Sequence, residues 1–181
     1  PRQPRIISRT PLDGYGDGVC VRGRYCFVAT GHHSRGMRKH DESDPGFGHG
    51  HGLEIFDVTQ PDSPTFVSRV KAPRYYRIGM DMWDVIVSGN TAYLADTYNG
   101  VFTIDISDIR KPSFTGHRQL AHVKSRKASS PVGGFAIGNG VIYAAGAWTD
   151  LHVIAAPMAT PPELEPDAPP VILPGKPAES D

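Results

Sequence analysis

Short apolar runs separated by polar turns dominate the hydrophobic pattern of the chain. The clearest group has an apolar run at 87–96, a turn at 97–100 and a second apolar run at 101–106. Runs of this length, bounded by Gly, Asn, Asp and Pro, predict β-strands joined by turns. The runs that open each group lack a clean polar face; they lie at 19–21, 85–87 and 135–137. We therefore expect these opening strands to be buried on both faces.

The same group of runs recurs along the chain. A shift of 50 residues places Val87 on Ile137. Upstream, Val21 lies 66 residues before Val87, whereas Leu53 lies only 48 residues before Val101. The difference is an insertion of 18 residues in the first copy. A repeat of about fifty residues, each with four short strands, is typical of the blades of a β-propeller.

The closing run of the repeat also occurs once before the first copy. Residues 3–10 resemble 63–70 and 111–118, because each segment has Pro at its second position and a large apolar residue at its fourth. We expect 3–10 to be the outer strand of a blade whose other strands lie in the last unit or in another chain. An uncovered strand carrying Ile6 and Ile7 would be an aggregation-prone edge.

The repeat predicts an all-β, β-propeller-like fold: about three four-stranded antiparallel blades plus one extra outer strand, within a partial propeller at 1–156. The predicted blade units are 18–70, 83–118 and 132–156. Residues 157–181 contain eight prolines and predict an extended tail. A β-sandwich is the alternative fold, although it does not explain the fixed period. Because propellers close with about four to eight blades, we expect missing sequence or another chain to complete or cover this one.

The units resemble those of the LVIVD-repeat family. In that family a Gly precedes an aromatic-aliphatic strand, and a second aliphatic strand ends in Asp before a Pro and a last strand. The likeness is strongest at 83–116, where Gly89, Tyr93, Asp105 and Pro112 stand at these places. The resemblance implies a propeller-like protein that is periplasmic, extracellular or at the cell surface. It implies no particular activity, since the family has no universal catalytic motif.

Composition removes several classes of partner and fold. The 19 Lys and Arg residues balance 19 Asp and Glu residues, so the basic surface that nucleic acids select is absent and we expect no nucleic-acid partner. The 20 Gly and 17 Pro residues argue against a helix bundle. The longest stretch without a charged residue, 128–149, contains a proline and five glycines, so we predict no transmembrane segment.

The insertion at 31–52 is the first candidate functional segment. It holds five of the eight histidines of the chain, together with three acidic residues. Neutral imidazole suits zinc or copper, and the strands on either side would bring the two ends of the insertion together. The predicted metal ligands are two or three of His32, His33, His49 and His51. The alternatives are a solvated Gly/His loop without a ligand and a segment that contacts a partner protein.

The loop before the second unit is the second candidate. It combines aromatic area with opposite charges, a composition enriched in binding hot spots. The candidate binding residues are Tyr75, Tyr76, Arg77, Asp81 and Trp83. The alternative role for these aromatic residues is packing between blades.

Two cysteines, Cys20 and Cys26, stand symmetrically around a predicted hairpin turn. A hairpin could place them opposite each other, close enough for a disulfide. Their repeat equivalents are the apolar residues Ile86 and Ala92, so the alternative is a pair of free thiols in the core.

Two turn predictions follow from local sequence. Asn99 and Gly100 suit a two-residue type I′ turn, because both residues tolerate positive φ. Asp57 and Asp105 precede turns that contain Pro, and we expect their carboxylates to accept hydrogen bonds from the backbone of those turns.

No recognised catalytic signature is present, neither a GxSxG nucleophile turn, a phosphate-binding Gly loop nor a CxxCH haem site. The sequence therefore favours a non-catalytic binding or scaffold subunit that docks onto other protein chains, identical or different, in an exported or surface assembly. The alternative is a metal-binding propeller protein, including a redox metalloenzyme, that uses the insertion at 31–52. A purely structural repeat with a flexible loop is the third hypothesis.

Overall fold

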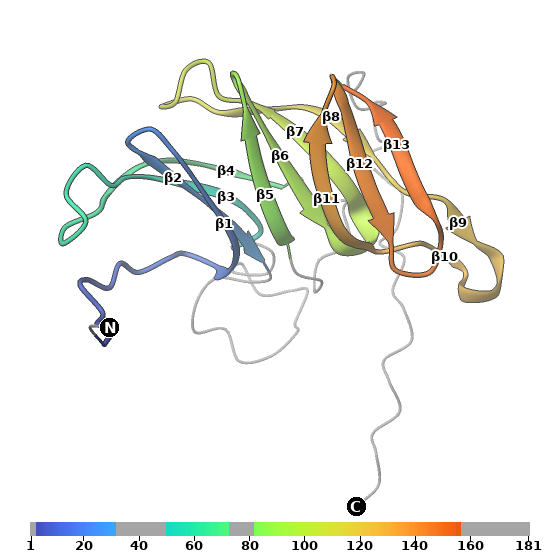
Figure 1. Ribbon diagram of the computed structural model, residues 1–181, viewed down its shortest axis with the longest axis horizontal. Helices are drawn as coiled ribbons and strands as arrows, with labels where there is room; N and C mark the ends of the chain where they lie inside the picture. Colours follow the sequence, from blue (N-terminus) through green and yellow to red (C-terminus); the bar gives the residue numbers. More distant parts are fainter. Residues whose placement is uncertain (1–2, 32–49, 73–81, 157–181) are drawn as a thin grey trace, which may run out of the picture.

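The computed structural model describes residues 3–31, 50–72 and 82–156 (Figure 1). In these residues the fold is all-β and antiparallel, with two short 3-10 helices, η1 (Thr97–Asn99) and η2 (Lys124–Arg126). The predicted all-β, propeller-like class is confirmed. No helix of the described residues is long and apolar enough to cross a membrane.

Three sheets follow one another along the chain, and a two-stranded ribbon separates the second from the third. Sheet 1 consists of β1 (Tyr15–Arg22), β2 (Tyr25–Gly31), β3 (Gly52–Asp57) and β4 (Thr65–Lys71). Sheet 2 consists of β5 (Met82–Ser88), β6 (Thr91–Asp96), β7 (Gly100–Asp105) and β8 (Ser113–Arg118). Sheet 3 consists of β11 (Val132–Gly138), β12 (Val141–Gly146) and β13 (Leu151–Ala155). The ribbon is β9 (His122–Val123) with β10 (Ala128–Ser129).

The first hairpin of each sheet is closed by a two-residue turn that its sequence permits. In sheet 3 the turn residues Asn139 and Gly140 have φ of 51° and 73°, the values of a type I′ turn. The turns of sheets 1 and 2 begin with Gly23 and Gly89, at φ of 58° and 57°. Asn and Gly tolerate positive φ at low cost, so local sequence sets the register of all these hairpins.

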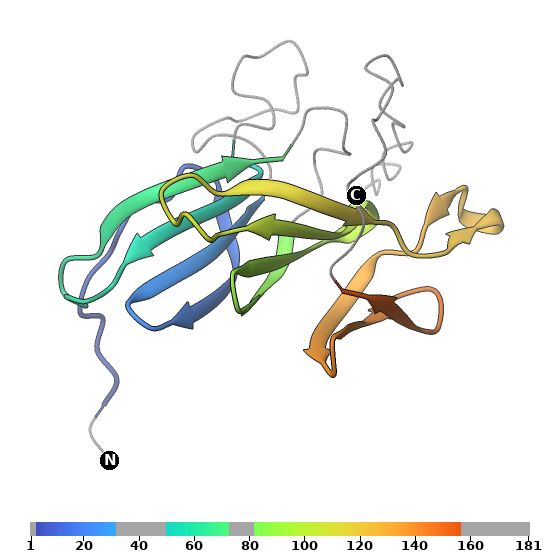
Figure 2. The same ribbon diagram turned by 90° about the horizontal axis from the view of Figure 1, so that it is seen from above.

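The sheets pack face to face in chain order (Figures 1 and 2). Strand β5 contacts both β1 and β11, so the first strand of each sheet lies on the same inner side of the array. Strands β4 and β8 are the outer strands of their sheets. We call the face that a sheet turns toward the next sheet in the chain its trailing face, and the opposite face its leading face.

Two apolar clusters hold the sheets together. Between sheets 1 and 2, the trailing face of sheet 1 (Phe27, Ala29, Leu53, Ile55) packs on the leading face of sheet 2 (Val85, Val87, Leu94, Phe102, Ile104). Between sheets 2 and 3, the trailing face of sheet 2 (Tyr93, Ala95, Val101) packs on the leading face of sheet 3 (Val132, Ile142, Ala144). In sheet 2 the opening strand is packed on both faces, which explains the missing polar face of 85–87. The same expectation is wrong for 19–21, where Val19 and Val21 are 62% and 60% exposed, and for 135–137, where Ala136 is exposed, because no described sheet packs on the outer faces of sheets 1 and 3.

The structure differs from the sequence prediction at the outer strands. Sheet 3 has three strands within residues 82–156, where four were predicted. Residues 3–10 form no strand in the described chain, and Ile6 and Ile7 are 88% and 61% exposed. The missing fourth strand of sheet 3 and the unpaired segment 3–10 have one physical reason. A strand forms by hydrogen bonding to a neighbouring edge, and within the described chain 3–10 does not lie beside the edge of β13. In the single chain, the predicted outer strand is therefore not formed.

The turn after β6 also differs from the prediction. Residues 97–99 form a 3-10 turn, and only Gly100 has positive φ, at 94°, so the predicted type I′ turn at Asn99 and Gly100 is wrong. The Asn99 side chain donates to the buried carboxylate of Asp96, and the Asn99 carbonyl accepts a hydrogen bond from His117. These two contacts, one local and one to the neighbouring strand β8, accompany the 3-10 conformation of Asn99.

Both predicted aspartate turn caps are confirmed. The Asp57 carboxylate accepts hydrogen bonds from the Thr59 backbone N–H at 2.9 Å, and the Asp105 carboxylate accepts one from the Ser107 backbone N–H at 2.8 Å. These hydrogen bonds lower the pKa of both carboxyl groups; at Asp57 the side chain of Arg24 contributes most.

Candidate functional site

A buried polar cluster lies at the end of the apolar contact between sheets 1 and 2. It consists of His51, Asp96, Asn99 and His117. His51 directly precedes β3, at the point where the insertion joins sheet 1, and Asp96 ends β6. The strand ends therefore bring the base of the insertion against sheet 2.

Hydrogen bonds connect the cluster across the two sheets. His51 Nε2 donates to Asp96 Oδ2 at 2.8 Å, and Asn99 Nδ2 donates to the same oxygen at 2.9 Å. The side chains of His51 and Asp96 are 1% and 0% exposed. Asp96 Oδ1 is also buried and accepts no hydrogen bond from any described residue. A buried carboxylate of this kind depends on its few donors for stability.

His117 extends the cluster toward the outer strand of sheet 2. Its ring stacks on Phe102, with ring centroids 4.6 Å apart, and its Nε2 donates to the Asn99 carbonyl. Burial lowers the pKa of His117, although the Asn99 hydrogen bond and the charge of Asp96 oppose the shift. His117 therefore favours its neutral form in the folded protein.

The geometry of the cluster indicates a structural junction. A general base must lie within hydrogen-bond reach of a substrate proton, and His51 is sealed between two sheets. The pair instead ties His51, the residue before β3, to Asp96 at the end of β6. It thus joins sheet 1 to sheet 2 at this end of the apolar contact.

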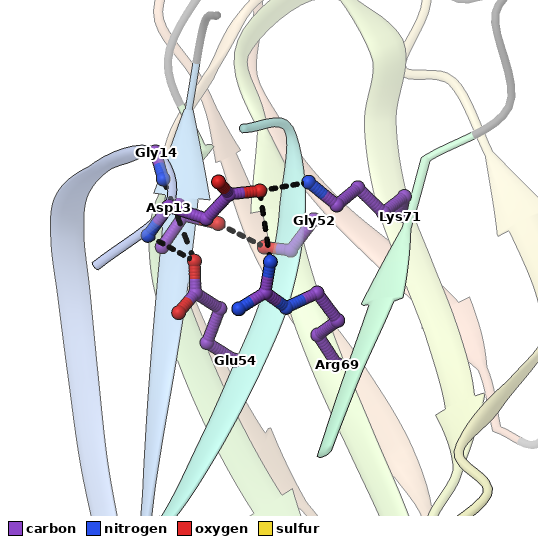
Figure 3. A network of polar contacts seen from close by, with 7 residues as sticks. Asp13, Gly14, Gly52, Glu54, Arg69 and Lys71 are labelled. Atoms are coloured by element: carbon purple, nitrogen blue, oxygen red, sulfur yellow. Dashed lines mark hydrogen bonds and ion pairs between the residues drawn. The ribbon is translucent and has the colours of Figure 1, made fainter. Parts of the chain in front are cut away.

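A second polar network lies on the leading face of sheet 1 (Figure 3). Glu54 Oε1 accepts hydrogen bonds from the backbone N–H groups of Asp13, at 2.8 Å, and Gly14, at 3.4 Å. The Asp13 carboxylate in turn pairs with Arg69, at 3.0 Å, and with Lys71. This network clamps the segment before β1 onto the leading face, and Glu54 is only 3% exposed beneath it.

Exposed apolar side chains gather on the two end faces of the array. On sheet 1, Val19 and Val21 are 62% and 60% exposed, and on sheet 3, Leu151 and Val153 are 66% and 61% exposed. Sheet 2 carries none of the exposed large apolar side chains in the described part of the chain. Each pair stands two residues apart on one strand and therefore lies on the same face of its sheet, and exposed apolar residues that adjoin each other are features of sites of protein association.

A groove lies beside the free edge of sheet 3. Its volume is about 740 Å³, and it is lined by residues 117–121, at the end of β8, and by 151–154 of β13. Because β13 pairs only with β12 among the described strands, its other edge presents backbone donors and acceptors to this groove.

Comparison with known protein families assigns the central sheet, sheet 2, to a known repeat. Residues 79–118, which include all of sheet 2, match the family model of the LVIVD repeat. The chain carries an LVIVD repeat. The predicted resemblance is confirmed for this segment, and LVIVD repeats are β-propeller-like, in agreement with the fold. No curated protein matches the chain.

The LVIVD repeat contains most of the polar cluster that sequence analysis missed. Asp96, Asn99 and His117 all lie within it, whereas His51 lies outside. A signal was available, because the repeat equivalents of Asp96 are Thr30 and Gly146. A carboxylate at a position that is otherwise small and uncharged indicates a specific contact, although no local pattern names His51 as the donor.

The predicted metal site is only partly described. His32, His33 and His49 lie outside the described residues, and His51 takes part in the buried pair with Asp96. Within residues 3–31, 50–72 and 82–156, no group of three or more His, Cys, Asp or Glu side chains is arranged to hold a metal ion. Zinc or copper binding therefore stays a prediction.

Most residues of the predicted binding loop, 75–83, lie outside the residues that the structure describes. Tyr75, Tyr76, Arg77 and Asp81 are not among the described residues. The backbone of Trp83 belongs to β5, but its side chain is outside the description. A binding role for these residues stays a prediction.

Of the two alternatives for Cys20 and Cys26, the structure has the free thiols. Cys20 pairs with Phe27 and Cys26 pairs with Val21, so the two cysteines are offset by one residue in the register. Because neighbouring residues of a strand point to opposite faces, one thiol faces sheet 2 and the other faces the leading side of sheet 1. Both thiols are free, and burial raises the pKa of Cys26.

Proposed function

We propose that this propeller-like protein is a binding or scaffold subunit whose end faces dock onto other protein chains. The single observation that carries the proposal is the location of the exposed apolar residues. The exposed side chains of Val19, Val21, Leu151 and Val153 lie on the outer faces of the first and last sheets, and sheet 2 has no equivalent in the described residues. Surfaces built like the internal contacts between sheets are suited to accept another sheet.

The assembly is proposed to be exported or surface-associated. This part rests on the resemblance to LVIVD-repeat proteins and on no contact in the fold. Fractionation of cells that make the protein tests it, since a protein recovered only with the cytoplasm contradicts export.

The docking role is tested by native electrophoresis of extracts from cells that make the protein. Wild-type chain should migrate in a species larger than a monomer, while Val21→Glu and Leu151→Glu should each shift it to the monomer position. Ser113→Glu is the matched control, because Ser113 is an exposed strand residue of sheet 2. Wild-type chain that migrates only as a monomer would refute the docking role.

A second candidate function is metal binding at the insertion 31–52. It is supported by the position of His51, which joins the insertion to the buried carboxylate of Asp96, an acceptor with one oxygen left without a described donor. Elemental analysis of protein purified without chelators should find zinc or copper near one ion per chain. His49→Ala should reduce this content more than His40→Ala, and metal at background level in the wild-type protein refutes the site.

A further inference from the structure

We infer that two copies of this chain associate head to tail. The trailing face of sheet 3 of one copy packs on the leading face of sheet 1 of the other, whose residues 5–10 add to β13 as the fourth strand of sheet 3. This inference rests on the proposed function, because it names the chain that the end faces bind.

The packing rule is already present twice within one chain. The trailing face of sheet 1 packs on the leading face of sheet 2, and the trailing face of sheet 2 packs on the leading face of sheet 3. Each contact joins the same pair of faces of the repeat. A trailing face and a leading face are therefore complementary in this protein.

The two uncovered faces are the remaining members of that pair. Val21 on the leading face of sheet 1 stands at the repeat position of Val87, which is 5% exposed, yet Val21 is 60% exposed. Leu151 on the trailing face of sheet 3 stands at the position of Val101, which is 0% exposed, yet Leu151 is 66% exposed. Joining these faces would bury both residues as their equivalents are buried.

The edge of sheet 3 has space for one more strand. Sheets 1 and 2 have outer strands β4 and β8, whereas β13 is an edge in the described part of sheet 3. The groove of about 740 Å³ lies along this edge. Strand addition to an open edge is a common mode of protein recognition, because the backbone groups of the edge supply the hydrogen bonds.

Residues 3–10 have the sequence of the strand that sheet 3 lacks. They resemble 63–70 and 111–118, which contain β4 and β8. Along the chain, β4 comes just before sheet 2 but belongs to sheet 1, the sheet on the leading side of sheet 2. By the same order, 3–10 comes just before sheet 1 and should belong to the sheet that packs on its leading face.

The register of the added strand follows from sheet 1. There Phe56 pairs with Phe66 and Ile55 with Ser68. The equivalent pairs between copies join Ile154 to Ile6 and Val153 to Ser8. Pro4 falls outside the pairing, where its missing N–H carries no cost.

One side chain limits how far the pairing extends. The third strands of sheets 1 and 2 begin with a glycine, Gly52 in β3 and Gly100 in β7. A Cβ at either glycine would lie 2.1 Å from a carbonyl oxygen of the outer strand, β4 or β8. Sheet 3 has Asp150 at this position. The added strand therefore pairs with β13 only from Leu151 onward.

The segment before β1 is held against sheet 1 at two points. The Glu54 carboxylate fixes Asp13 and Gly14 on the leading face, and the Ser8 hydroxyl donates to the Pro61 carbonyl at 2.8 Å. Ser68 makes the equivalent bond to Ile109 between sheets 1 and 2, so Ser8 already stands to sheet 1 as an outer strand of a preceding sheet would. The face contact and the strand exchange thus involve the same neighbour. Two copies joined at both ends would form a ring of six sheets, three from each copy. Closed propellers have about four to eight blades, so six is a number that can close.

The first test is the mass of the purified chain in native mass spectrometry and light scattering. We expect a species of twice the 19.6 kDa chain mass. Leu151→Glu and deletion of residues 1–10 should each raise the dissociation constant by at least ~30-fold, since they remove a buried anchor or a strand. Ser113→Glu should leave it unchanged, and far-UV circular dichroism should report the same strand content in all variants.

The second test is a disulfide between copies. Ser8→Cys protein mixed with Val153→Cys protein should form a covalent dimer under mild oxidation, because the inferred register places these residues opposite each other. Ser8→Cys mixed with Ser113→Cys is the matched control and should not. Both mixtures use a background in which Cys20 and Cys26 are replaced by Val and Ala.

The outcomes separate the inference from the proposed function. The head-to-tail pair is overturned if the purified chain stays monomeric and the Ser8→Cys and Val153→Cys proteins form no disulfide with each other. If the chain in cell extracts still runs in a larger species that Leu151→Glu abolishes, the docking role stands with a different chain as partner. A dimer that Leu151→Glu leaves intact overturns the inferred geometry.

Discussion

Replacement of His51 by Ala tests the buried pair that anchors the insertion. His51 supplies one of the two donors to Asp96 Oδ2, at 2.8 Å, and Asn99 supplies the other at 2.9 Å. After the substitution, a fully buried carboxylate keeps one hydrogen bond for two oxygens among the described residues. We therefore expect the folded protein to lose stability without any change in its exposed surface.

The magnitude follows from the environment of Asp96. A hydrogen bond to a charged group contributes about 1.5–3 kcal/mol, and removing one member of a buried pair costs about 3–5 kcal/mol. Because both side chains are at most 1% exposed, the upper range applies. Asp96→Asn removes the charge, so adding His51→Ala to it should cost less, with a coupling of about 1–3 kcal/mol between the two positions.

The measurement is urea unfolding at one pH, followed by tryptophan fluorescence and far-UV circular dichroism, for the wild type, both single variants and the double variant. His122→Ala is the control, because His122 is exposed and should change the free energy of unfolding by less than about 0.5 kcal/mol. A cost of His51→Ala below about 1 kcal/mol, or a coupling near zero, would refute the assigned role of the pair.

Three further predictions concern other parts of the fold. Gly100→Ala should destabilise the protein by about 2–5 kcal/mol, because Gly100 has φ of 94° and a Cβ would lie 2.1 Å from a carbonyl oxygen of β8. Gly134→Ala is the control and should change thermal stability little, because the space around Gly134 is open. Burial lowers the pKa of His117, so just below about pH 6.5 the unfolded state binds more protons than the folded state. The free energy of unfolding should therefore fall as pH falls through that range. His117→Gln should flatten this part of the curve of stability against pH. Cys20 and Cys26 should both react with a thiol reagent in denaturant without reductant, and a count of zero would restore the disulfide.

Sequence repetition was sufficient to predict the class of fold. Strand period and turn residues act locally, so the hairpins at Gly23, Gly89 and Gly140 follow from a few neighbouring residues. The aspartate caps at Asp57 and Asp105 are local for the same reason, since donor and acceptor are two residues apart. The LVIVD repeat at 79–118 was recognisable because its pattern combines these local signals.

Contacts between distant residues were decided only by the tertiary structure. His51 and Asp96 are 45 positions apart, and their pairing depends on how sheet 1 packs on sheet 2. The one-residue offset that separates Cys20 from Cys26 depends on strand register, which sequence symmetry around a turn does not specify.

The sequence by itself determined the inner strands of the three sheets and their apolar positions, because these properties belong to single repeats. It also marked 3–10 as strand-like, by its likeness to 63–70. Only the tertiary structure decided that this segment finds no edge within the described chain and that Val21 and Leu151 stay exposed. A strand is completed by hydrogen bonds to a neighbour, so its formation depends on an edge elsewhere in space, and local sequence cannot specify where that edge lies.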